Sequence, residues 1–319
     1  MNTKNHLFPS ADVINAAAKR IAPFIHHTPV LTCATINKLL GAQLFFKCEN
    51  FQKVGAFKFR GACNAVFSID DTEIKNGIAT HSSGNHAQAI ALAASMRNTK
   101  AYIVMPYTAP KVKREAVIGY GAEVISCEPS LRSREKTLEA VVARTGANII
   151  HPYNDYCVIA GQATCAKELI EEIGEPDYLV SPVGGGGLLG GTALSAAWFT
   201  NNTKVIGAEP SGADDAKRSL LAGVIIPSEN PKTIADGLLS SLGDKTFPII
   251  QNYVDDILTA DDESIIYWMK MVWQRMKIII EPSCAVVLAA IASHPDKFAN
   301  RRLGVILTGG NVDLENLPF

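Results

Sequence analysis

Short apolar runs alternate with amphipathic or alanine-rich segments along the whole chain. The runs of strand type lie at residues 44–48, 77–81, 101–105, 123–126, 148–150, 178–183, 204–209 and 304–307. Strands that alternate with helices in this way indicate an α/β fold with a mainly parallel sheet. In such folds ligands bind where the strands end and the helices begin, so we expect the site to be built from the segments that follow the strands.

The first helix is predicted over residues 10–22. Ser10 can cap it, and Val13, Ala17 and Ile21 fall on one face at helical spacing. Pro23 favours its end. We interpret this helix as structural.

Four consecutive glycines, Gly184 to Gly187, separate an apolar run from a helix-like segment at residues 192–198. Glycines let several backbone N–H groups converge on one point, and the following helix adds its positive N-terminal end, so the loop suits a phosphate. It lacks the lysine and hydroxyl of a nucleotide P-loop and the spacing of a dinucleotide fingerprint, which favours a small phosphate-bearing cofactor over ATP or NAD. The alternative is a tight turn that ends a buried strand, and this loop by itself does not separate the two.

Lys58 lies between Phe57 and Phe59 at the start of a predicted helix. Aromatic neighbours that exclude water lower the pKa of a lysine, and a neutral amine is what a nucleophile or Schiff-base former needs. The alternative is a surface lysine whose stem lies along an aromatic patch. Taken alone, this segment favours the alternative.

A second polar segment follows the strand at residues 77–81. Ser82, Ser83, Asn85 and His86 place hydroxyls, an amide and backbone donors at the start of an alanine-rich helix. This arrangement is a natural receptor for a carboxylate. The alternative is an ordinary helix cap with several polar residues.

Composition narrows the class of protein. The 319 residues include 30 basic and 31 acidic side chains, so the charge balance suggests neither a nucleic acid nor an anionic membrane as partner. No apolar run is long and clean enough to span a bilayer, and residues 1–6 lack the apolar segment of a signal peptide. Seven cysteines without a CxxC pair or zinc spacing indicate reduced thiols. We therefore expect a soluble, cytoplasmic protein of one large or two medium domains.

Four segments, in order, resemble the fold type II pyridoxal-phosphate enzymes, in the branch that holds serine racemase, threonine/serine dehydratase and threo-3-hydroxyaspartate dehydratase. These segments are residues 55–62, 82–86, 182–187 and 307–313. The likeness covers essentially the whole chain and decides the alternatives for the glycine loop, the lysine and the serine segment in favour of function.

The resemblance implies a two-lobed α/β fold similar to the tryptophan synthase β chain, with mainly parallel sheets and helices on both faces. Residues 1–76 and 153–319 would form a large cofactor-binding domain. Residues 77–152 would form a small mobile domain that closes on an amino-acid substrate. A homodimer is also implied.

The resemblance gives each cofactor-binding residue a role. Lys58 would form the Schiff base with pyridoxal 5'-phosphate, Phe57 would lie beside the ring, and Asn85 would bond the ring hydroxyl. The residues that would hold the phosphate are Gly184, Gly185, Gly186 and Gly187. Thr308 would face the pyridine nitrogen, where a neutral hydroxyl offers no counter-ion, which favours β-elimination over transamination.

The implied reaction is β-elimination from L-threonine, L-serine or L-threo-3-hydroxyaspartate to a 2-oxo acid and ammonia, with the freed Lys58 amine removing the α-proton. Ser83 would lie on the opposite face, where a hydroxyl can exchange a proton with the other side of Cα. Racemisation of serine or aspartate by Lys58 and Ser83 is therefore the alternative. A non-catalytic binding protein is a third possibility, which the intact motifs argue against. The residues implied to bind the substrate are Ser82, Ser83, Gly84, Asn85, His86, Arg134 and His151.

Two further features follow from the resemblance to the serine-racemase-like members. Glu209, Asp215 and the carbonyl of Ala213 match a divalent-cation site, and oxygen ligands suit Mg²⁺, Mn²⁺ or Ca²⁺. Arg134 and His151 match positions that line the substrate mouth. A guanidinium there would favour a second carboxylate, as in 3-hydroxyaspartate, whereas a surface salt bridge is the alternative role for the arginine.

Overall fold

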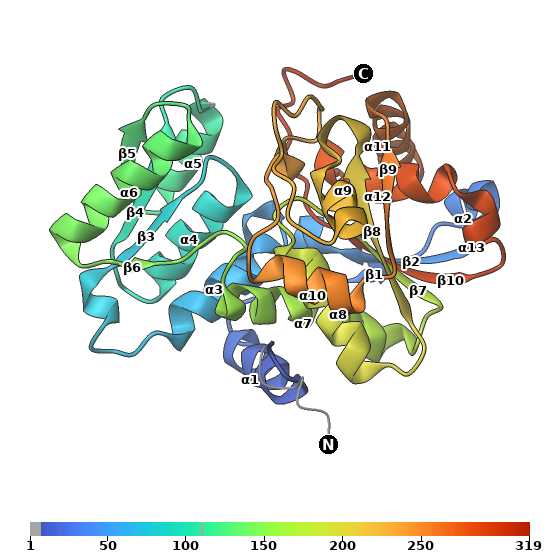
Figure 1. Ribbon diagram of the computed structural model, residues 1–319, viewed down its shortest axis with the longest axis horizontal. Coiled ribbons are helices and arrows are strands. Elements are labelled where there is room, and N and C mark those ends of the chain that lie inside the picture. Colours follow the sequence, from blue (N-terminus) through green and yellow to red (C-terminus); the bar gives the residue numbers. More distant parts are fainter. Residues whose placement is uncertain (1–7, 110) are drawn as a thin grey trace.

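The computed structural model describes residues 8–109 and 111–319 and contains two β-sheets flanked by helices (Figure 1). It confirms the α/β class and the mainly parallel sheets expected from the sequence. The N-terminal residues on which the signal-peptide argument rests lie outside the described ranges. Within those ranges, no helix combines the length and the apolar character needed to cross a membrane.

The larger sheet has six strands in the order β1-β2-β10-β7-β8-β9. β1 is antiparallel to β2, and all other neighbouring strands are parallel. The strands are β1 (Val30–Leu31), β2 (Gln43–Cys48), β7 (Tyr178–Pro182), β8 (Lys204–Pro210), β9 (Asp256–Ala260) and β10 (Arg302–Leu307). Strand β10 therefore lies in the interior of the sheet, between β2 and β7, although it comes last among the described strands.

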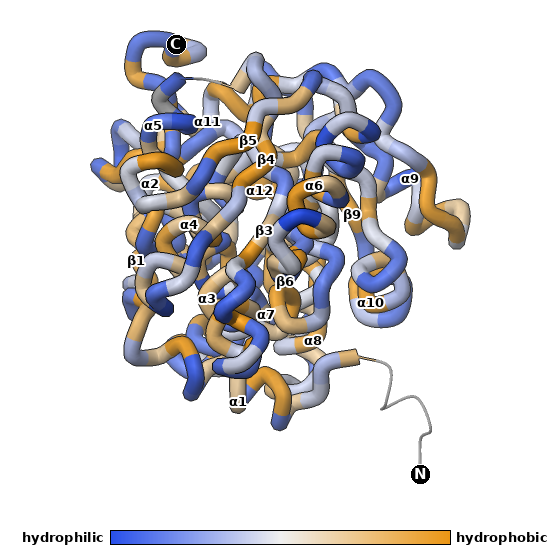
Figure 2. Tube along the Cα trace, turned by 90° about the vertical axis from the view of Figure 1, so that its left-hand side faces the viewer, coloured by the Kyte–Doolittle hydropathy of each residue, from blue (hydrophilic) through white to orange (hydrophobic). Residues whose placement is uncertain are grey.

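The smaller sheet has four parallel strands in the order β5-β4-β3-β6 and comes from one continuous part of the chain. Its strands are β3 (Ile78–His81), β4 (Ala101–Pro106), β5 (Glu123–Cys127) and β6 (Asn148–Ile149). Figure 1 shows this sheet and its helices on the left, beside the larger sheet. Figure 2 shows apolar residues along β3 and β4, and every residue of β4 is buried.

Thirteen α-helices connect the strands of the described ranges. They are α1 (Ala11–Ile21), α2 (Ala34–Leu40), α3 (Lys58–Ser68), α4 (Asn85–Met96), α5 (Lys111–Gly119), α6 (Leu131–Thr145), α7 (Tyr156–Ile173), α8 (Gly187–Phe199), α9 (Asp215–Ala222), α10 (Thr246–Tyr253), α11 (Asp262–Met276), α12 (Pro282–Ala292) and α13 (Pro295–Phe298). Short 3₁₀ helices lie at Glu49–Phe51, Lys53–Gly55, Ile74–Asn76, Ser211–Ala213 and Asp236–Leu238.

Alternate residues of the central strands face opposite layers of the core, as the pleat of a strand requires. In β7, Val180 joins the cluster formed with α11 and α12, and Leu179 joins the cluster formed with α7, α8 and α10. In β4, Ile103 packs with α3 and α4 on one face, and Val104 packs toward α6 on the other. Both sheets are thus buried on two sides, which explains their continuous apolar runs.

A buried charge cluster of Lys47, Glu49, Arg60 and Glu168 joins β2 to α3 and α7. The Arg60 guanidinium is fully buried and forms paired hydrogen bonds of 2.7–2.8 Å with the carboxylate of Glu49 and of 2.7 Å with that of Glu168. Lys47 Nζ lies 2.8 Å from Glu168. Two positive and two negative groups therefore balance inside the protein, and they fix the first turn of α3.

Helix α1 has the predicted cap, but one of its predicted core residues is wrong. Ser10 accepts a hydrogen bond from the Val13 backbone, as expected. The buried residues are Ile14, Ala17 and Ile21, whereas the Val13 side chain is 48% exposed. Adjacent apolar residues at positions 13 and 14 allow two helical stripes one residue apart, and packing on α7 and α8 selects the stripe that contains Ile14.

Candidate active site

The segments that follow β2, β7 and β10 meet at one edge of the larger sheet because these three strands are parallel neighbours. The segment after β2 leads to Lys58, the segment after β7 is the glycine loop, and the segment after β10 contains Thr308. A backbone bridge between Ala56 and Gly309 joins the first and third of these segments. The sheet topology thus brings together three of the four motifs found in the sequence.

Lys58 is the first residue of α3, and its amine is held in a largely dry environment. Its Nζ donates a hydrogen bond of 3.0 Å to the carbonyl of Pro152 and lies 5.2 Å from the centre of the Phe57 ring. Burial lowers the pKa of Lys58 to about 8, and the negative charge of Glu281 opposes part of that shift. The Phe59 ring is fully buried in the core. A neutral amine is accordingly accessible near neutral pH.

The serine segment, residues 82–84, connects β3 of the smaller sheet to α4. The Gly84 backbone N–H donates to Ser82 Oγ at 3.3 Å, which shapes the turn. Asn85 and His86 form the first turn of α4, where free backbone N–H groups and the helix dipole favour an anion. The His86 ring is buried, and burial followed by the charge of Lys58 lowers its pKa well below the ordinary value. Both of its ring nitrogens lack a partner among the described residues.

The glycine loop needs glycine for two physical reasons. Gly186 has φ of 88°, a left-handed conformation that other residues adopt at a cost. A Cβ on Gly185 would lie 2.3 Å from the Tyr153 ring, so only glycine fits beneath that ring. Thr246 Oγ1 supports the loop by donating to the Gly185 carbonyl at 2.8 Å. Helix α8 begins at Gly187 and directs its positive end toward the loop.

Asn85 is fixed by Glu281, which precedes α12, and by Asn311, which follows β10. The first of these two residues was missed from the sequence. Its Nδ2 lies 3.1 and 3.2 Å from the two carboxylate oxygens of Glu281, and its Oδ1 accepts a 2.9 Å hydrogen bond from Asn311. Asn311 belongs to a motif noted in the sequence, whereas Glu281 was not singled out. Burial raises the pKa of Glu281 to about 7. The Thr308 hydroxyl nearby is buried and has no partner within the described ranges.

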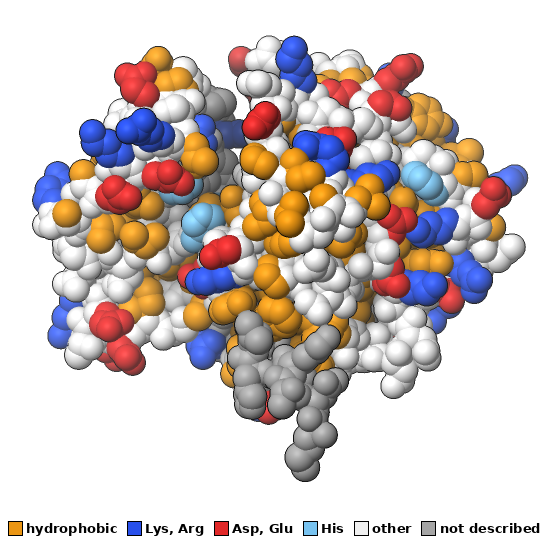
Figure 3. Space-filling model, viewed as in Figure 1, with side chains coloured by type: hydrophobic (Ala, Val, Ile, Leu, Met, Phe, Trp, Pro, Cys, Tyr) orange, Lys and Arg blue, Asp and Glu red, His pale blue; other side chains and the backbone are white. Residues whose placement is uncertain are grey.

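His81, the last residue of β3, lies beside His151, and Arg134 of α6 is close enough to His81 to affect its charge. The rings of His81 and His151 are perpendicular, with centres 5.9 Å apart. His151 Nδ1 accepts from the backbone N–H groups of Tyr153 and Asn154 at 3.4 and 3.0 Å, so its proton resides on Nε2. Burial, with the charge of His81, lowers the pKa of His151 to about 4. Figure 3 shows histidine side chains at the surface along the boundary between the two lobes.

Arg134 has an unmet hydrogen-bonding group in this cluster. Its Nε is buried and has no partner in the part of the chain that the structure describes. Burial and the charge of Arg134 both lower the pKa of His81. The guanidinium is therefore close enough to His81 to affect its charge, and no ion pair of Arg134 occurs among the described residues. This is the arrangement expected of a group that awaits an anionic ligand.

Glu209 and Asp215 form a separate acidic cluster at the end of β8. The Glu209 carboxylate accepts from the backbone N–H groups of Lys217 and Ala216 at 2.7 and 3.2 Å. Burial raises the pKa of Glu209 to about 8 and that of Asp215 to about 6. Asp215 Oδ2 is buried and has no partner among the described residues, and Ala213 ends the short 3₁₀ helix just before it. Among residues 8–109 and 111–319, no group of three or more His, Cys, Asp and Glu side chains is arranged to hold a metal.

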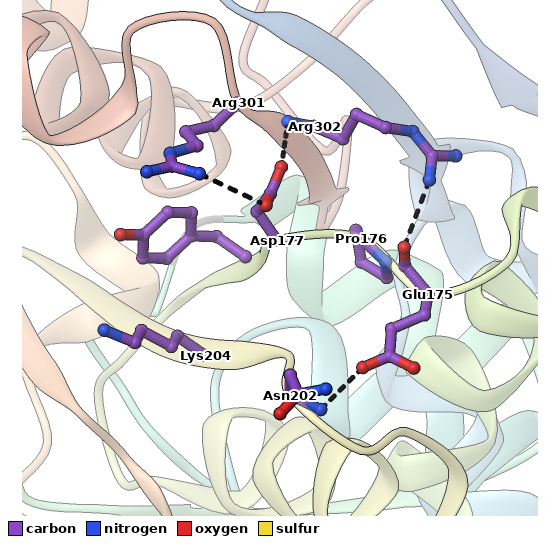
Figure 4. Close-up of a pocket in the computed structure, with 8 residues that line it drawn as sticks. Glu175, Pro176, Asp177, Asn202, Lys204, Arg301 and Arg302 are labelled. Carbon is purple, nitrogen blue, oxygen red and sulfur yellow. Dashed lines mark hydrogen bonds and ion pairs between the residues drawn. The ribbon is translucent and has the colours of Figure 1, made fainter.

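A pocket at the opposite end of the larger sheet is structural. It is lined by Glu175, Pro176, Asp177, Tyr178, Asn202, Lys204, Arg301 and Arg302 (Figure 4). The Arg302 backbone N–H donates to Asp177 at 2.7 Å, and the Arg302 guanidinium donates to the Glu175 carbonyl at 3.1 Å. These contacts join the starts of β7 and β10, whereas ligands of parallel sheets bind at the strand ends.

Comparison with known proteins agrees with this geometry. The family model described as "Pyridoxal-phosphate dependent enzyme" matches residues 21–309. The chain is 52% identical to a beta-hydroxyaspartate dehydratase of Paracoccus denitrificans, over 98% of this chain and 99% of that protein. It is 45% identical to an L-threo-3-hydroxyaspartate ammonia-lyase of Saccharomyces cerevisiae, over 95% and 93% of the two chains. The crystal structure of a serine racemase from Dictyostelium discoideum is similar, with a TM-score of 0.92, 50% identity and coverage of 96% and 99%.

Proposed function

We propose that this chain, which belongs to the family of pyridoxal-phosphate-dependent enzymes, is an ammonia-lyase that converts a β-hydroxy amino acid to a 2-oxo acid and ammonia. The candidate substrates are L-threonine, L-serine and L-threo-3-hydroxyaspartate. The observation that carries the proposal is the buried Lys58 amine. Burial lowers its pKa to about 8, and the start of α4 and the glycine loop before α8 both suit anions.

The residues present fit the cofactor. The Thr308 hydroxyl is buried and lacks a partner among the described residues, as a group facing a ring nitrogen would. Gly184 to Gly187 and the start of α8 suit the phosphate. Lys58 would hold the aldehyde, Phe57 would lie beside the ring, and Asn85 would bond the ring hydroxyl. When bound, pyridoxal phosphate supplies an aldehyde that captures amines and an electron-withdrawing ring that acidifies the α-C–H bond.

The protein's own groups would then bind the substrate and move its protons. The substrate carboxylate would lie at the start of α4, where Ser82, Gly84 and His86 contribute hydroxyl and backbone donors. The Lys58 amine would remove the proton from Cα, because its pKa of about 8 leaves it partly neutral near pH 7. Neutral His151 would donate from Nε2 to the substrate.

Among the three candidates, L-threo-3-hydroxyaspartate is favoured by the Arg134 guanidinium. A second carboxylate on the substrate would supply the partner that Arg134 Nε lacks among the described residues. The names of the two relatives that act on hydroxyaspartate agree with this preference. Threonine and serine offer only a methyl group or a hydrogen at the same place.

The second candidate function is racemisation of serine or aspartate. It is supported by the Dictyostelium serine racemase, which is as similar to the chain as the ammonia-lyases are. Ser83, in the loop between β3 and α4, would exchange a proton with the face of Cα opposite Lys58. Elimination and racemisation therefore share Lys58 and differ in whether the β-hydroxyl leaves.

The acidic cluster is proposed as a divalent-cation site. Glu209, Asp215 and the Ala213 carbonyl offer oxygen ligands only, and Asp215 Oδ2 is unpartnered within the described ranges. Mg²⁺, Mn²⁺ or Ca²⁺ prefers such ligands, with water completing its shell. Val183, just before the glycine loop, donates its N–H to the carbonyl of Ala208 in β8 at 2.9 Å. A cation bound at the neighbouring Glu209 would therefore stiffen β8 where it supports the glycine loop.

Residues 77–152 are proposed to move as a small domain against residues 1–76 and 153–319. The polar contacts between the smaller lobe and the larger one include those from Asn85 to Glu281 and from Lys113 to Asp236 at 2.6 Å. Opening would break both. We also propose that the enzyme is a cytoplasmic homodimer, which sedimentation and cell fractionation would test.

The decisive experiment is a product assay on purified protein loaded with pyridoxal phosphate and Mg²⁺. Each of the three substrates is offered separately, and oxo acid, ammonia and D-amino acid are quantified. We expect oxo acid and ammonia in equal amounts, fastest from L-threo-3-hydroxyaspartate. D-amino acid as the main product would replace the lyase by the racemase, and Ser83→Ala would then be the next variant to test.

A further inference from the structure

The Glu281 carboxylate points away from the helix that it precedes. Glu281 is the N-cap residue of α12, yet its side chain makes no capping hydrogen bond, and Pro282 follows it. Its backbone N–H donates to the Gly309 carbonyl at 2.9 Å. A Cβ on Gly309 would lie 2.8 Å from Glu281 Oε1, so glycine leaves the room that the carboxylate occupies. The side chain is only 5% exposed and is thus committed to a place inside the protein.

The Glu281 carboxylate lies beside the Asn85 amide, and hydrogen bonds with Glu281 and Asn311 determine the orientation of that amide. Asn311 Nδ2 donates to the Val54 carbonyl at 2.7 Å and to Asn85 Oδ1 at 2.9 Å, so both of its hydrogens are used. Asn85 therefore presents its oxygen to Asn311 and its nitrogen to Glu281, at 3.1 and 3.2 Å from the two carboxylate oxygens. Because the Val54 carbonyl fixes the Asn311 amide and Asn311 donates to Asn85, the flipped Asn85 amide is excluded. The two acceptors belong to one carboxylate and lie on the same side of Asn85 Nδ2, so they share one N–H, which leaves the second N–H for a ligand.

The same carboxylate is close to the catalytic amine and to the contact between the lobes. The charge of Glu281 raises the pKa of Lys58, against the lowering by burial. Asp236 raises and Lys113 lowers the pKa of Glu281, so these two charges also face it. The Glu281 side chain thus lies between α3, α4 and the 3₁₀ helix that carries Asp236, and it makes no capping hydrogen bond to α12.

We propose that Glu281 is a positioning residue that holds the Asn85 amide with its second N–H directed at the ring hydroxyl of the cofactor. The inference rests on the proposed function, because it requires pyridoxal phosphate to occupy the site. Glu281 and Asn311 clamp Asn85 from its two sides. Without the clamp, the amide would rotate and the ring would lose a fixed hydrogen-bond donor. Fixing a ligand-binding group beforehand strengthens binding because less freedom is lost when the ligand arrives.

The test measures the affinity of the protein for the cofactor and the orientation of the bound pyridoxal ring. Apoprotein is titrated with pyridoxal phosphate by fluorescence, and the visible circular dichroism of the holoenzyme reports how the ring is held. Glu281→Ala should weaken cofactor binding about 10-fold, the effect of losing one hydrogen bond to a charged group, and should change the dichroism. Glu281→Gln should stay within about 3-fold of the wild type, because its amide oxygen still accepts from Asn85.

Asp261→Ala is the matched control for loss of an acidic residue at a helix start. Asp261 caps α11 by accepting from Ser264 N–H at 2.7 Å and has no contact with the Asn85 network. This variant should lose thermal stability and keep the wild-type dichroism and cofactor affinity. If Glu281→Ala behaves like Asp261→Ala, the role of Glu281 is structural and the proposal is overturned.

A double-mutant cycle tests whether Glu281 acts through Asn85. In an Asn85→Ala background, Glu281→Ala should weaken cofactor binding no further, whereas additive losses would show that Glu281 acts by another route. Should Glu281→Ala fail to fold, Asn311→Ala removes the opposite side of the clamp and should change the dichroism in the same direction. An unchanged spectrum in Asn311→Ala would refute the clamp. Wild-type protein that takes up no pyridoxal phosphate would refute the proposed function itself, before any variant is compared.

Discussion

Replacing Arg60 by methionine tests how the buried charge cluster supports the start of α3. Methionine keeps much of the side-chain length but removes the guanidinium from its paired hydrogen bonds with Glu49 and Glu168. Glu49 is fully buried and would retain only the hydroxyl of Thr28 as a side-chain partner among the described residues. Removing one partner of a buried ion pair destabilises a protein by about 3–5 kcal/mol.

The expected loss can be expressed as a melting temperature. An unfolding entropy of about 2.1 cal/mol/K per residue gives about 0.7 kcal/mol/K for a chain of this length. A loss of about 4 kcal/mol therefore lowers the Tm of Arg60→Met by about 6 °C. The control is Lys297→Met, which removes a partly exposed ion pair with Asp256 and should cost at most about 1 kcal/mol. Calorimetry of the two apoproteins beside the wild type measures both effects.

The pH dependence gives an independent check on the same variant. Burial would raise the pKa of Glu168, but hydrogen bonds and charge from Arg60, with Lys47, outweigh it and lower the pKa. A lowered carboxyl pKa contributes stability above its unfolded value, and that contribution disappears as the pH falls through the folded value. The difference in Tm between wild type and Arg60→Met should therefore narrow below about pH 4. Equal melting of Arg60→Met and Lys297→Met at pH 7 would refute the reasoning.

Three further predictions concern the site. In apoprotein, modification of Lys58 by a small amine reagent, followed by peptide mass spectrometry, should be half-maximal near pH 8 instead of 10.5, because burial lowers its pKa; a midpoint near 10.5 would contradict this. Mg²⁺ at a hundred times its Kd should stabilise the protein by about 2.7 kcal/mol in thermal melts. Asp215→Asn should abolish the gain, and persistence of the gain would place the cation elsewhere. Arg134→Met should raise KM for L-threo-3-hydroxyaspartate by about 10-fold or more and change KM for L-serine little, and equal effects on both would show that Arg134 binds no second carboxylate.

The candidate site residues were predicted from several motifs taken together, and no single segment was enough. Taken alone, the glycine loop left two interpretations open and the segment around Lys58 favoured a surface lysine. The resemblance carried by four motifs in order decided both in favour of function. Eight of the ten described strands were placed to within a few residues, because both sheets are buried on two sides and leave continuous apolar runs. The two edge strands of the larger sheet, β1 and β9, were missed.

Glu281 could not be found in this way, because its partner Asn85 lies 196 residues away. The only local signal is a glutamate directly before a proline at a helix start, which reads as an ordinary cap. The prediction that Val13 lies on the buried face of the first helix was wrong for a related reason. Helical periodicity alone does not say which of two adjacent apolar stripes packs against the rest of the protein. The order of the strands within each sheet could not be predicted from the sequence either, because strand pairing is decided by packing between distant segments.

The interior position of β10 has a consequence for the way the chain is made. While residues 302–307 are still unsynthesised, β2 and β7 each lack their shared neighbour and expose an unpaired edge. The smaller sheet comes from residues 78–149 and needs no strand from later in the chain. We expect the smaller sheet to become resistant to protease before the larger sheet during synthesis. The nascent chain should depend on chaperones until β10 is inserted. A ribosome-bound chain stopped before residue 302 that already protects β2 and β7 would contradict this order.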